Sequence, residues 1–592
     1  MPKKATTTKA TTKKATTTKA TPAKAESKKT VAKLGSVAEL EELRKSILSK
    51  RDQKKPCIAI CGGTGCHALG NRDIINAFEK EIEKQSLKNK VDIRETGCPG
   101  FCEKGPIVVI YPEEICYVEV APEDAAEIVT QSIVGKKVVD RLVYTDPNTG
   151  VKAVHQAEIP FYKSQMRLLI GDNGKIDPKS IEDYLAIGGY SALAKVMQNM
   201  SPEQVVAEIN KSTLRGRSGA GVSAGLKWGA TQKAEGETKY VICNCHEGDP
   251  GAFADRRMME ANPHNILEAM IIGAFAMKAT DGYIYVGDEF PLTVENTETA
   301  IRQAEEYGLL GKNILGSGLD FTIKVAIDAG DYVCGEMSAL MASIEGRVGE
   351  PVIRYDHATE RGLWNKPTDV NNLQTFANVP LIINRGADWY LTIGTERSKG
   401  TRTFSLIGTI NNTGLVEVPM GMTLRQVIYD IGGGIREGNK FKAVLAGGPL
   451  GAFIPESQLD LRVDFDDISK AGGSLGPSLV VIDEKTCIVD MVKYFLTFLS
   501  NESCGKCSPC RDGLEQILKI VNNITEGNGK EGDLDLLETI FDAQVAALCP
   551  LGQTASSPAR SAIKYFRDEF DAHIKERRCP AGVCKILSTV MH

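Results

Sequence analysis

Three cysteines in the segment "CGKCSPC", at positions 504–510, constrain this chain more than any other feature. Cys504, Cys507 and Cys510 have a spacing that suits an iron–sulfur cluster, and a [4Fe–4S] cube requires a fourth thiolate from elsewhere. The chain has 16 Cys among 592 residues, and they fall in tight groups without a secretory signal pattern. We therefore expect cluster or metal ligands in a reducing compartment rather than disulfides.

The length and composition indicate a soluble protein with several cores. A chain of 592 residues is too long for one domain, and its 42% hydrophobic and 25% charged residues and net charge of −5 are ordinary for a soluble protein. No apolar run reaches the ~18 residues of a membrane-spanning helix, and "AMIIGAFAMKA" at 269–279 predicts a buried helix. We expect a cytoplasmic protein without membrane insertion and without a nucleic-acid partner.

Shifts in composition divide the chain into six parts, and the predicted fold class is multi-domain α/β. Residues 1–32 form a basic tail rich in Thr, Lys and Ala, which we expect to be disordered. Such a tail suits nucleic acid or an acidic partner, although a solubilising extension is the simpler interpretation. The other parts are an α+β unit (33–135), a larger α/β unit (136–395), a β-grasp-like module (396–482), a helical region (483–577) and a tail (578–592). The β-grasp-like module shows no evident ligand residues, and we interpret it as a spacer or docking element.

Two further cysteine pairs lie in glycine-containing loops that follow predicted strands. They are Cys61 and Cys66 in "CGGTGC", and Cys98 and Cys102 in "GCPGFC". Two such pairs suit a small iron–sulfur cluster, while four thiolates also suit structural zinc. The spacings are wider than in zinc knuckles, which favours iron–sulfur. Cys57 and Cys116 lie on apolar strands, and we interpret them as core thiols.

Four polar, glycine-marked loops in the larger α/β unit predict one ligand pocket at strand ends. The loop at 214–231 offers glycines for close backbone approach and two cations for a phosphate, namely Gly216, Arg217, Gly219, Gly221 and Lys227. The loop at 241–256 contains Glu247 and Asp249, which are placed to hold hydroxyl groups. The segments 330–347 and 366–380 supply the other two loops. The pattern is not GxGxxG and lacks the GK[ST] of a P-loop.

Taken together, these motifs resemble a known family. "GRSGAG", "GLKW", "NCHEGDPGAFADR", "GEMSALMASIEGR", "KPTDVNN" and "ESCGKCSPCR" resemble the FMN-binding, NADH-oxidising subunit of complex I. They resemble still more the β subunit of NAD-linked and electron-bifurcating [FeFe]-hydrogenases, which carries a fused thioredoxin-like [2Fe–2S] domain. The resemblance covers roughly residues 50–585, and implies a thioredoxin-like ferredoxin domain, a Rossmann-like FMN domain and a helical bundle with a [4Fe–4S] cluster.

The resemblance also implies specific ligands. Cys61, Cys66, Cys98 and Cys102 would bind the [2Fe–2S] cluster, and Cys549 would complete the [4Fe–4S] set with Cys504, Cys507 and Cys510. The expected FMN site consists of Gly216, Arg217, Gly219, Gly221, Lys227, Asn244, Glu247, Asp249, Tyr332, Gly335, Glu336, Asn371, Asn372 and Thr375. No side chain is expected to act as a general base, because the hydride chemistry belongs to the flavin.

A third metal site is expected near the end of the chain. Cys487, His573, Cys579 and Cys584 offer three thiolates and one imidazole, which suit tetrahedral zinc, and related hydrogenase β subunits carry zinc in this region. The alternative is a surface histidine beside a loose thiol pair. Relatives usually continue into a ferredoxin-like domain, so we expect partner subunits to carry electrons onward: a cluster-rich α subunit, a small [2Fe–2S] γ subunit and ferredoxin.

The nucleotide region departs from the family pattern at several positions. Val222 replaces an aromatic residue, Ala230 stands where another aromatic is common, and His246 and Met337 replace acidic residues. The segment "RYDHATE" also replaces "RPPFPA". We expect a subunit that exchanges hydride between NAD(H) or NADP(H) and FMN and passes single electrons to the clusters. The alternative is a relay subunit that has lost nucleotide binding.

Overall fold

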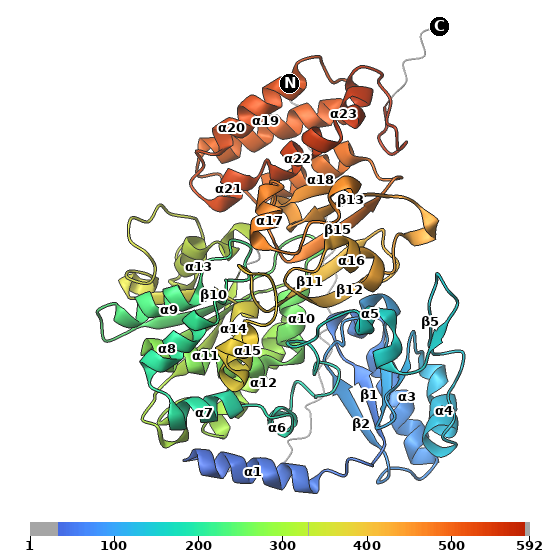
Figure 1. The fold of residues 1–592 in the computed structure, drawn as a ribbon, viewed down its shortest axis with the longest axis vertical. Helices are drawn as coiled ribbons and strands as arrows, with labels where there is room; N and C mark the ends of the chain where they lie inside the picture. Colours follow the sequence, from blue (N-terminus) through green and yellow to red (C-terminus); the bar gives the residue numbers. More distant parts are fainter. Residues whose placement is uncertain (1–32, 329–330, 587–592) are drawn as a thin grey trace, which may run out of the picture.

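The computed structural model describes residues 33–328 and 331–586, and the predicted basic tail lies outside these residues. Three main sheets and a C-terminal set of helices follow one another along the chain (Figure 1). The arrangement confirms the predicted multi-domain α/β fold class. Loops from the parallel-sheet domain, the β-grasp module and the helical region meet around one cavity.

The largest domain is built on a parallel sheet with strand order β10-β7-β8-β9. Its strands are β7 (Tyr240–Asn244), β8 (Asp281–Gly287), β9 (Thr322–Asp328) and β10 (Thr368–Asn372). Helices on this domain include α7 (Ser191–Asn199), α8 (Pro202–Lys211), α9 (Ala224–Lys233), α11 (Pro263–Met277), α12 (Pro291–Glu306), α13 (Met337–Ile344) and α14 (Leu373–Arg385). Helix α11 is mainly apolar and buried nearly throughout, which confirms the buried helix predicted there. Because all four strands are parallel, their carboxyl ends meet at one edge of the sheet.

A smaller sheet of order β2-β1-β3-β4 forms the thioredoxin-like domain. Its strands are β1 (Cys57–Cys61), β2 (Asp92–Thr96), β3 (Val108–Tyr111) and β4 (Ile115–Tyr117), with α3 (Asn71–Lys84) packed against them. The apolar face of α3, including Ile74 and Phe78, is fully buried against the sheet. Cys57 and Cys116 are buried as predicted, and burial raises the pKa of Cys116 to about 12.

A five-stranded sheet of order β12-β11-β15-β13-β14 forms the β-grasp module. The strands are β11 (Thr401–Gly408), β12 (Gly414–Pro419), β13 (Phe441–Ala446), β14 (Ala452–Pro455) and β15 (Ser478–Asp483). It shares one apolar core with the thioredoxin-like domain. At this junction the Leu415 N–H donates to the Gly100 carbonyl at 2.7 Å, and the Glu103 N–H donates to the Thr413 carbonyl at 3.0 Å. The ring of Phe161, on the intervening helix α5 (Pro160–Lys163), stacks on Phe101 with centroids 4.3 Å apart. Backbone hydrogen bonds therefore join the two domains directly, and the aromatic stack lies in the core that they share.

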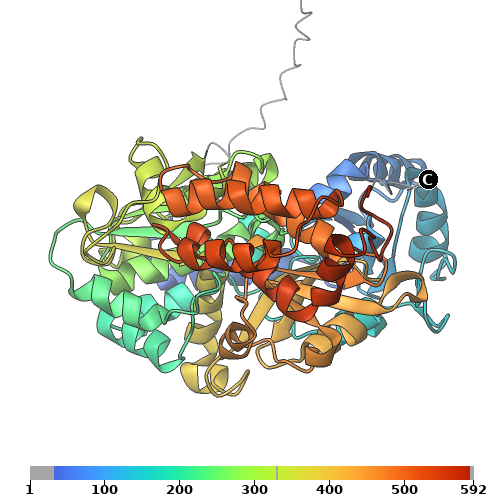
Figure 2. The same ribbon diagram turned by 90° about the horizontal axis from the view of Figure 1, so that it is seen from above.

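The C-terminal region is helical, as predicted, and lies over the β-grasp module (Figure 2). It comprises α18 (Ile488–Asn501), α19 (Ser508–Thr525), α20 (Asp533–Gln544), α21 (Pro550–Thr554), α22 (Ser557–Tyr565) and α23 (Arg567–Ile574). Its core is continuous with one face of the β-grasp sheet, where Leu445 and Phe453 contact the helices.

The first helix, α1 (Val37–Lys50), does not pack on the thioredoxin-like sheet, although the composition of the chain placed it in the same unit. Ser36 caps it, accepting a hydrogen bond from the Glu39 N–H. Its buried face, Val37, Leu40 and Ile47, joins the core of the parallel-sheet domain, and it lies beneath that domain in Figure 1. The position of α1 in the chain therefore does not determine which core it covers.

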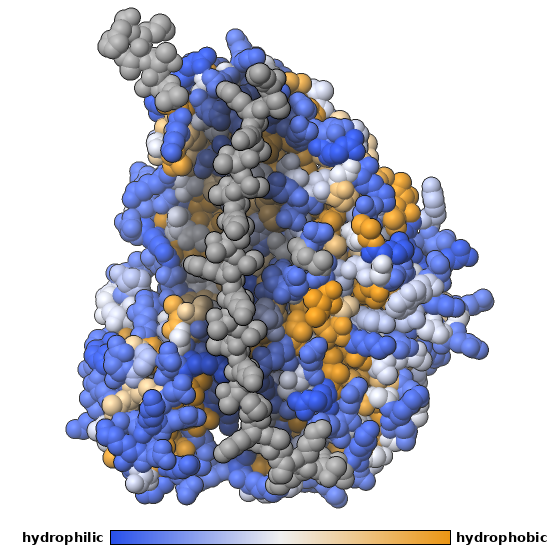
Figure 3. All heavy atoms as spheres, turned by 180° about the vertical axis from the view of Figure 1, so that it is seen from behind, coloured by the Kyte–Doolittle hydropathy of each residue, from blue (hydrophilic) through white to orange (hydrophobic). Residues whose placement is uncertain are grey.

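The surface seen in Figure 3 is largely hydrophilic, with apolar side chains gathered near its centre. Among the described residues, no helix is both long and apolar enough to cross a membrane.

The buried histidine of the largest core gives a testable prediction. His264 lies between Tyr190 and Gln303, at 3.0 and 3.1 Å, and burial lowers its pKa to about 4. As the pH falls below 6.5, the unfolded chain binds a proton that the folded chain excludes, so the free energy of unfolding should decrease by about 2 kcal/mol between pH 7 and pH 5 from this group.

Urea unfolding at both pH values, followed by tryptophan fluorescence, measures this contribution. In His264→Gln the decrease should be smaller than in the wild type by that amount, with the exposed His357→Gln as the matched control. An equal pH dependence in all three proteins would contradict the prediction.

Candidate functional site

A cavity of about 480 Å³ opens at the carboxyl edge of the parallel sheet and joins a second one of about 780 Å³. Both are bordered by Ser218, Asn244, Gly335, Met337 and Asn372. Of the fourteen expected FMN-site residues, eleven line one or both cavities: Gly216, Arg217, Lys227, Asn244, Glu247, Asp249, Tyr332, Gly335, Glu336, Asn371 and Asn372. The remaining three, Gly219, Gly221 and Thr375, lie outside the lining of both cavities.

The glycine-rich loop is fastened at both ends and so forms a fixed wall. The Gly216 N–H donates to the Val222 carbonyl at 2.7 Å, and the Arg217 N–H donates to Thr375 Oγ1 at 3.0 Å. Gly219 adopts a φ of 114°, which only glycine tolerates readily. Thr375 therefore contacts the backbone of the loop and holds it in place.

The guanidinium of Arg217 does not face the cavity, although the sequence predicted a phosphate ligand here. It is buried and donates to the Tyr390 hydroxyl and the Lys399 carbonyl, at 3.1 and 2.6 Å. These bonds tie the loop to the segment that leads into the β-grasp module. The charge of Arg217 is thus held within the wall rather than at its surface.

Lys227 extends from α9 into the wall of the second cavity. Its ammonium group donates to the Val370 carbonyl and lies 3.4 Å from both Asn371 Oδ1 and Asp369 Oδ1. Burial raises the pKa of Asp369, although the Lys227 cation opposes this shift. Lys227 therefore places one positive charge at the cavity, and the buried carboxyl group of Asp369 lies beside it.

Glu247 serves a helix as well as the cavity. Its buried carboxylate accepts hydrogen bonds from the N–H groups of Ala254, Asp255 and Arg256, the first residues of α10 (Ala254–Ala261). Burial, together with Asp255, raises its pKa to about 8. The helix N-terminus thus uses three of the roughly four acceptor sites of this carboxyl group, and a contact of Glu247 with a ligand hydroxyl stays a prediction.

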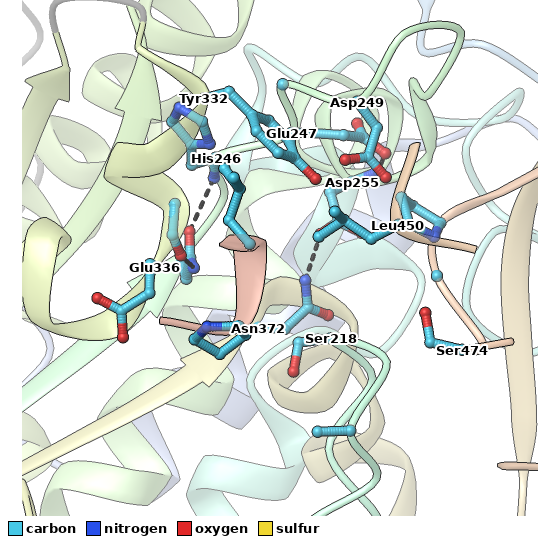
Figure 4. A pocket seen from close by; sticks show the side chains of 18 of the residues that line it. Ser218, His246, Glu247, Asp249, Asp255, Tyr332, Glu336, Asn372, Leu450 and Ser474 are labelled. Carbon is cyan, nitrogen blue, oxygen red and sulfur yellow. Dashed lines mark hydrogen bonds between the residues drawn. The ribbon is translucent and has the colours of Figure 1, made fainter. Parts of the chain in front are cut away.

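The acidic side chains above the cavity differ in how they are held (Figure 4). Asp255 accepts hydrogen bonds from Asn372 and Gln374. Burial raises the pKa of Asp249 to about 6. Asp249 lines the first cavity, and its hydrogen bond with Tyr332 opposes this rise of its pKa.

His246 stands where the family pattern has an acid, and the structure gives it a partner. Its Nε2 lies 3.0 Å from Asp328 Oδ2, and both side chains are almost fully buried. The ring packs so closely on Gly335 that an added Cβ there would lie 2.8 Å from Nδ1. His246 is therefore a fixed part of the cavity wall.

Sequence reasoning missed the contribution of the β-grasp module and of the helical region. Gly447, Leu450, Ser474, Gly476 and Pro477 line the first cavity, as do Pro550 and Leu551. The module is therefore more than a spacer. A signal was present in the repeated segments "AGGPLG" (446–451) and "AGGSLG" (471–476), whose glycines bring backbone to the cavity.

Cys504, Cys507, Cys510 and Cys549 converge on one small, otherwise mainly apolar cavity. Val333 and Leu551 line both this cavity and the larger one, so the two sites are neighbours. Burial raises the pKa of Cys510 to about 11. Four convergent thiols in an apolar enclosure fit a [4Fe–4S] cluster.

Cys61, Cys66, Cys98 and Cys102 also converge. The sulfur atoms of Cys98 and Cys102 are 3.8 Å apart, and hydrogen bonding with the thiols of Cys66 and Cys98 raises the pKa of Cys61. An added Cβ at Gly105 would lie 3.1 Å from the Cys66 sulfur, so this glycine leaves room beside the thiols. The set fits a small iron–sulfur cluster.

The third group consists of Cys487, His573, Cys579 and Cys584, whose ligand atoms all lie within 4.8 Å of one another. His573 Nδ1 donates to the Glu569 carbonyl at 2.6 Å, which leaves Nε2 toward the thiols. His573 is fully buried, so the alternative of a surface histidine is wrong. Hydrogen bonds from Cys584 and His573 hold the pKa of Cys487 well below its ordinary value despite burial.

Fold and site together define a flavin- and iron–sulfur-binding oxidoreductase subunit. Four regions match known families: the thioredoxin-like [2Fe–2S] ferredoxin at 46–132, the Nuo51 FMN-binding domain at 209–381, the SLBB domain at 403–453 and the NADH-ubiquinone oxidoreductase-F iron–sulfur binding region at 490–573. The chain belongs to the family of FMN-binding subunits that contains the F subunit of NADH-quinone oxidoreductase.

Two relatives illustrate this membership. The NADP-reducing hydrogenase subunit HndC of Solidesulfovibrio fructosivorans is 47% identical over 429 residues, 72% of this chain and 87% of that protein. The NADH-quinone oxidoreductase F subunit of Escherichia coli (strain K12) is 41% identical over 403 residues, 67% of this chain and 91% of that protein. A chain of an NAD⁺-reducing [NiFe]-hydrogenase in the H₂-reduced state has a similar fold, with a TM-score of 0.62 at 24% identity over 91% of this chain and 87% of that one.

The convergence of the C-terminal thiols predicts the effect of removing one of them. Cys549→Ser should lose the [4Fe–4S] signal in electron paramagnetic resonance and about 4 iron atoms per chain, because a cube needs four thiolates. The [2Fe–2S] signal should persist. Cys116→Ala, in the thioredoxin-like core, is the matched control, and an unchanged iron content in Cys549→Ser would contradict the ligand set.

Proposed function

We propose that this chain is the subunit of a multi-subunit hydrogenase or complex I-type assembly that oxidises NADH or NADPH at FMN and passes single electrons to its clusters. The observation that carries the proposal is the shared wall of the flavin cavity and the [4Fe–4S] cavity, formed by Val333 and Leu551. When bound, FMN accepts a hydride and releases electrons singly.

The residues of this chain would bind, orient and enclose the flavin. The glycine-rich loop and the glycines at 447 and 476 bring backbone close to the cavity, while Ser218, Asn244 and Asn372 supply hydrogen-bonding groups where the two cavities join. Tyr332 and Leu450 close the first cavity toward the C-terminal helices. These groups would hold FMN without serving as proton acceptors in the reaction.

The second cavity suits a nicotinamide nucleotide. Val222, Leu226 and Met337 expose apolar surface at its walls, where an adenine ring would be covered. The described residues that line this cavity include no carboxylate, but they include the basic side chains of Lys227 and His357. Since a carboxylate selects the free ribose of NAD and cations accommodate the extra phosphate of NADP, this lining favours acceptance of NADPH as well as NADH.

The first experiment is an anaerobic titration of the purified chain, with its clusters intact, by NADH and then by NADPH. Flavin absorbance should bleach rapidly with at least one nucleotide, and the nucleotide that bleaches it is the substrate. If neither bleaches a flavin that dithionite still reduces, the relay subunit is the correct function instead. Lys227→Ala should weaken the binding of the nucleotide or lower the amount of FMN that purifies with the chain. Lys312→Ala, which changes an exposed lysine, is its control.

The same proposal includes zinc at Cys487, His573, Cys579 and Cys584, because three thiolates and one imidazole whose ligand atoms lie within 4.8 Å of one another suit tetrahedral coordination. It further includes ferredoxin, a cluster-rich subunit and a small [2Fe–2S] subunit as partners, in the cytoplasm. The support for these partners is the presence of two cluster sites in a chain whose relatives are subunits of larger enzymes.

Metal analysis tests the zinc site. The wild type should contain about one zinc per chain, and Cys584→Ser should lose it and melt at lower temperature, because structural zinc contributes directly to folding. Cys116→Ala should retain the metal. A wild-type protein that binds no zinc, or that binds iron in its place, would contradict the assignment.

A further inference from the structure

Helix α10 connects the flavin cavity with the [2Fe–2S] loop. Its first N–H groups are bound by Glu247, which lines the cavity, and its eight residues span about 12 Å. Near its other end, Arg257 and Glu260 form an ion pair at 2.9 Å, and their side chains are only 7% and 2% exposed. Burying these two charges costs desolvation free energy, so the ion pair is expected to have a structural or functional role.

The ion pair holds the loop between Cys61 and Cys66. Glu260 accepts hydrogen bonds from the Thr64 hydroxyl at 2.5 Å and from the Thr64 N–H at 3.3 Å. Added Cβ atoms at Gly63 and Gly65 would each lie 3.1 Å from a terminal nitrogen of Arg257. The two glycines thus leave the space that the guanidinium fills, and the loop and the ion pair fit one another.

The ion pair with Glu260 leaves part of the donor capacity of Arg257 unused. Among the described residues its buried Nε has no hydrogen-bond acceptor. Burial alone would lower the pKa of Arg257, but Glu260 and the sulfur atoms of Cys98, Cys102 and Cys61 raise it above its ordinary value. A permanent cation therefore lies beside a site that fits an anionic cluster.

We propose that Arg257 is a positioning residue that raises the reduction potential of the [2Fe–2S] cluster, with Glu260 holding the guanidinium and the ligand loop in register. The proposal rests on the [2Fe–2S] site of the proposed function. Adding an electron increases the negative charge of a cluster held by thiolates, and a buried cation beside it favours that reduced form. Hydrogen bonds to cluster sulfur act in the same direction.

The test is a potentiometric titration of the full chain with dithionite and mediators, followed by the [2Fe–2S] resonance at a temperature where the [4Fe–4S] signal is absent. Arg257→Gln should shift the midpoint to a more negative value, with at least a tenfold lower reduced-to-oxidised ratio at fixed ambient potential, which is about 59 mV for a one-electron couple. Glu260→Gln, which removes the opposing charge, should shift it in the positive direction. Arg257→Lys, which keeps the cation, should remain closer to the wild type than Arg257→Gln.

Arg256→Gln is the matched control, because Arg256 is the neighbour of Arg257 on α10 and its guanidinium instead covers the Phe290 ring at 4.8 Å. It should leave the [2Fe–2S] potential unchanged. If Arg257→Gln loses the cluster, the test rests on a positive shift in Glu260→Gln together with a potential close to the wild type in Arg257→Lys. Shifts of the same sign in Arg257→Gln and Glu260→Gln, or no shift in a cluster-replete Arg257→Gln, would overturn the proposal. Because dithionite supplies the electrons, the outcome does not depend on nucleotide oxidation; a wild type without the [2Fe–2S] signal would overturn the site itself.

Discussion

The buried carboxylate of Glu247 at the start of α10 is the interaction on which the arrangement of the sites depends. A helix N-terminus inside a protein leaves unsatisfied N–H groups, and a loop that supplies one carboxylate to three of them fixes both the helix and itself. The loop after β7 then presents His246 and Asp249 to the cavity. The far end of the same helix meets the thioredoxin-like domain, so one capped helix sets the spacing between two sites.

Much of the fold could be predicted because its signals are local. Cysteine spacing indicates the cluster groups, and a nearly continuous apolar run indicates α11. Ligand loops are visible as glycines with polar neighbours, and most of the residues expected around the flavin do line the two joined cavities. Such features depend on residue type and short-range order, which a single sequence displays directly.

What could not be predicted depends on the direction of side chains and on which surfaces meet. Arg217 was expected to face a phosphate, but the hydroxyl of Tyr390 and the carbonyl of Lys399 orient it inward. The β-grasp module contributes mostly backbone and small side chains, which no residue pattern marks as ligands. Arg257 and Glu260 are charged residues on a short helix, a pattern that usually indicates solvent exposure, and only the packing of another domain buries them.

The packing of the thioredoxin-like domain against the β-grasp module has a kinetic consequence. The Leu415 to Gly100 hydrogen bond joins the two directly, and the stack of Phe101 on Phe161 of α5 lies in the core that they share. A domain held in this way does not work as a swinging carrier that collects an electron at one place and delivers it at another. Electron arrival at its cluster should then be insensitive to solvent viscosity, because no diffusive domain rotation precedes it.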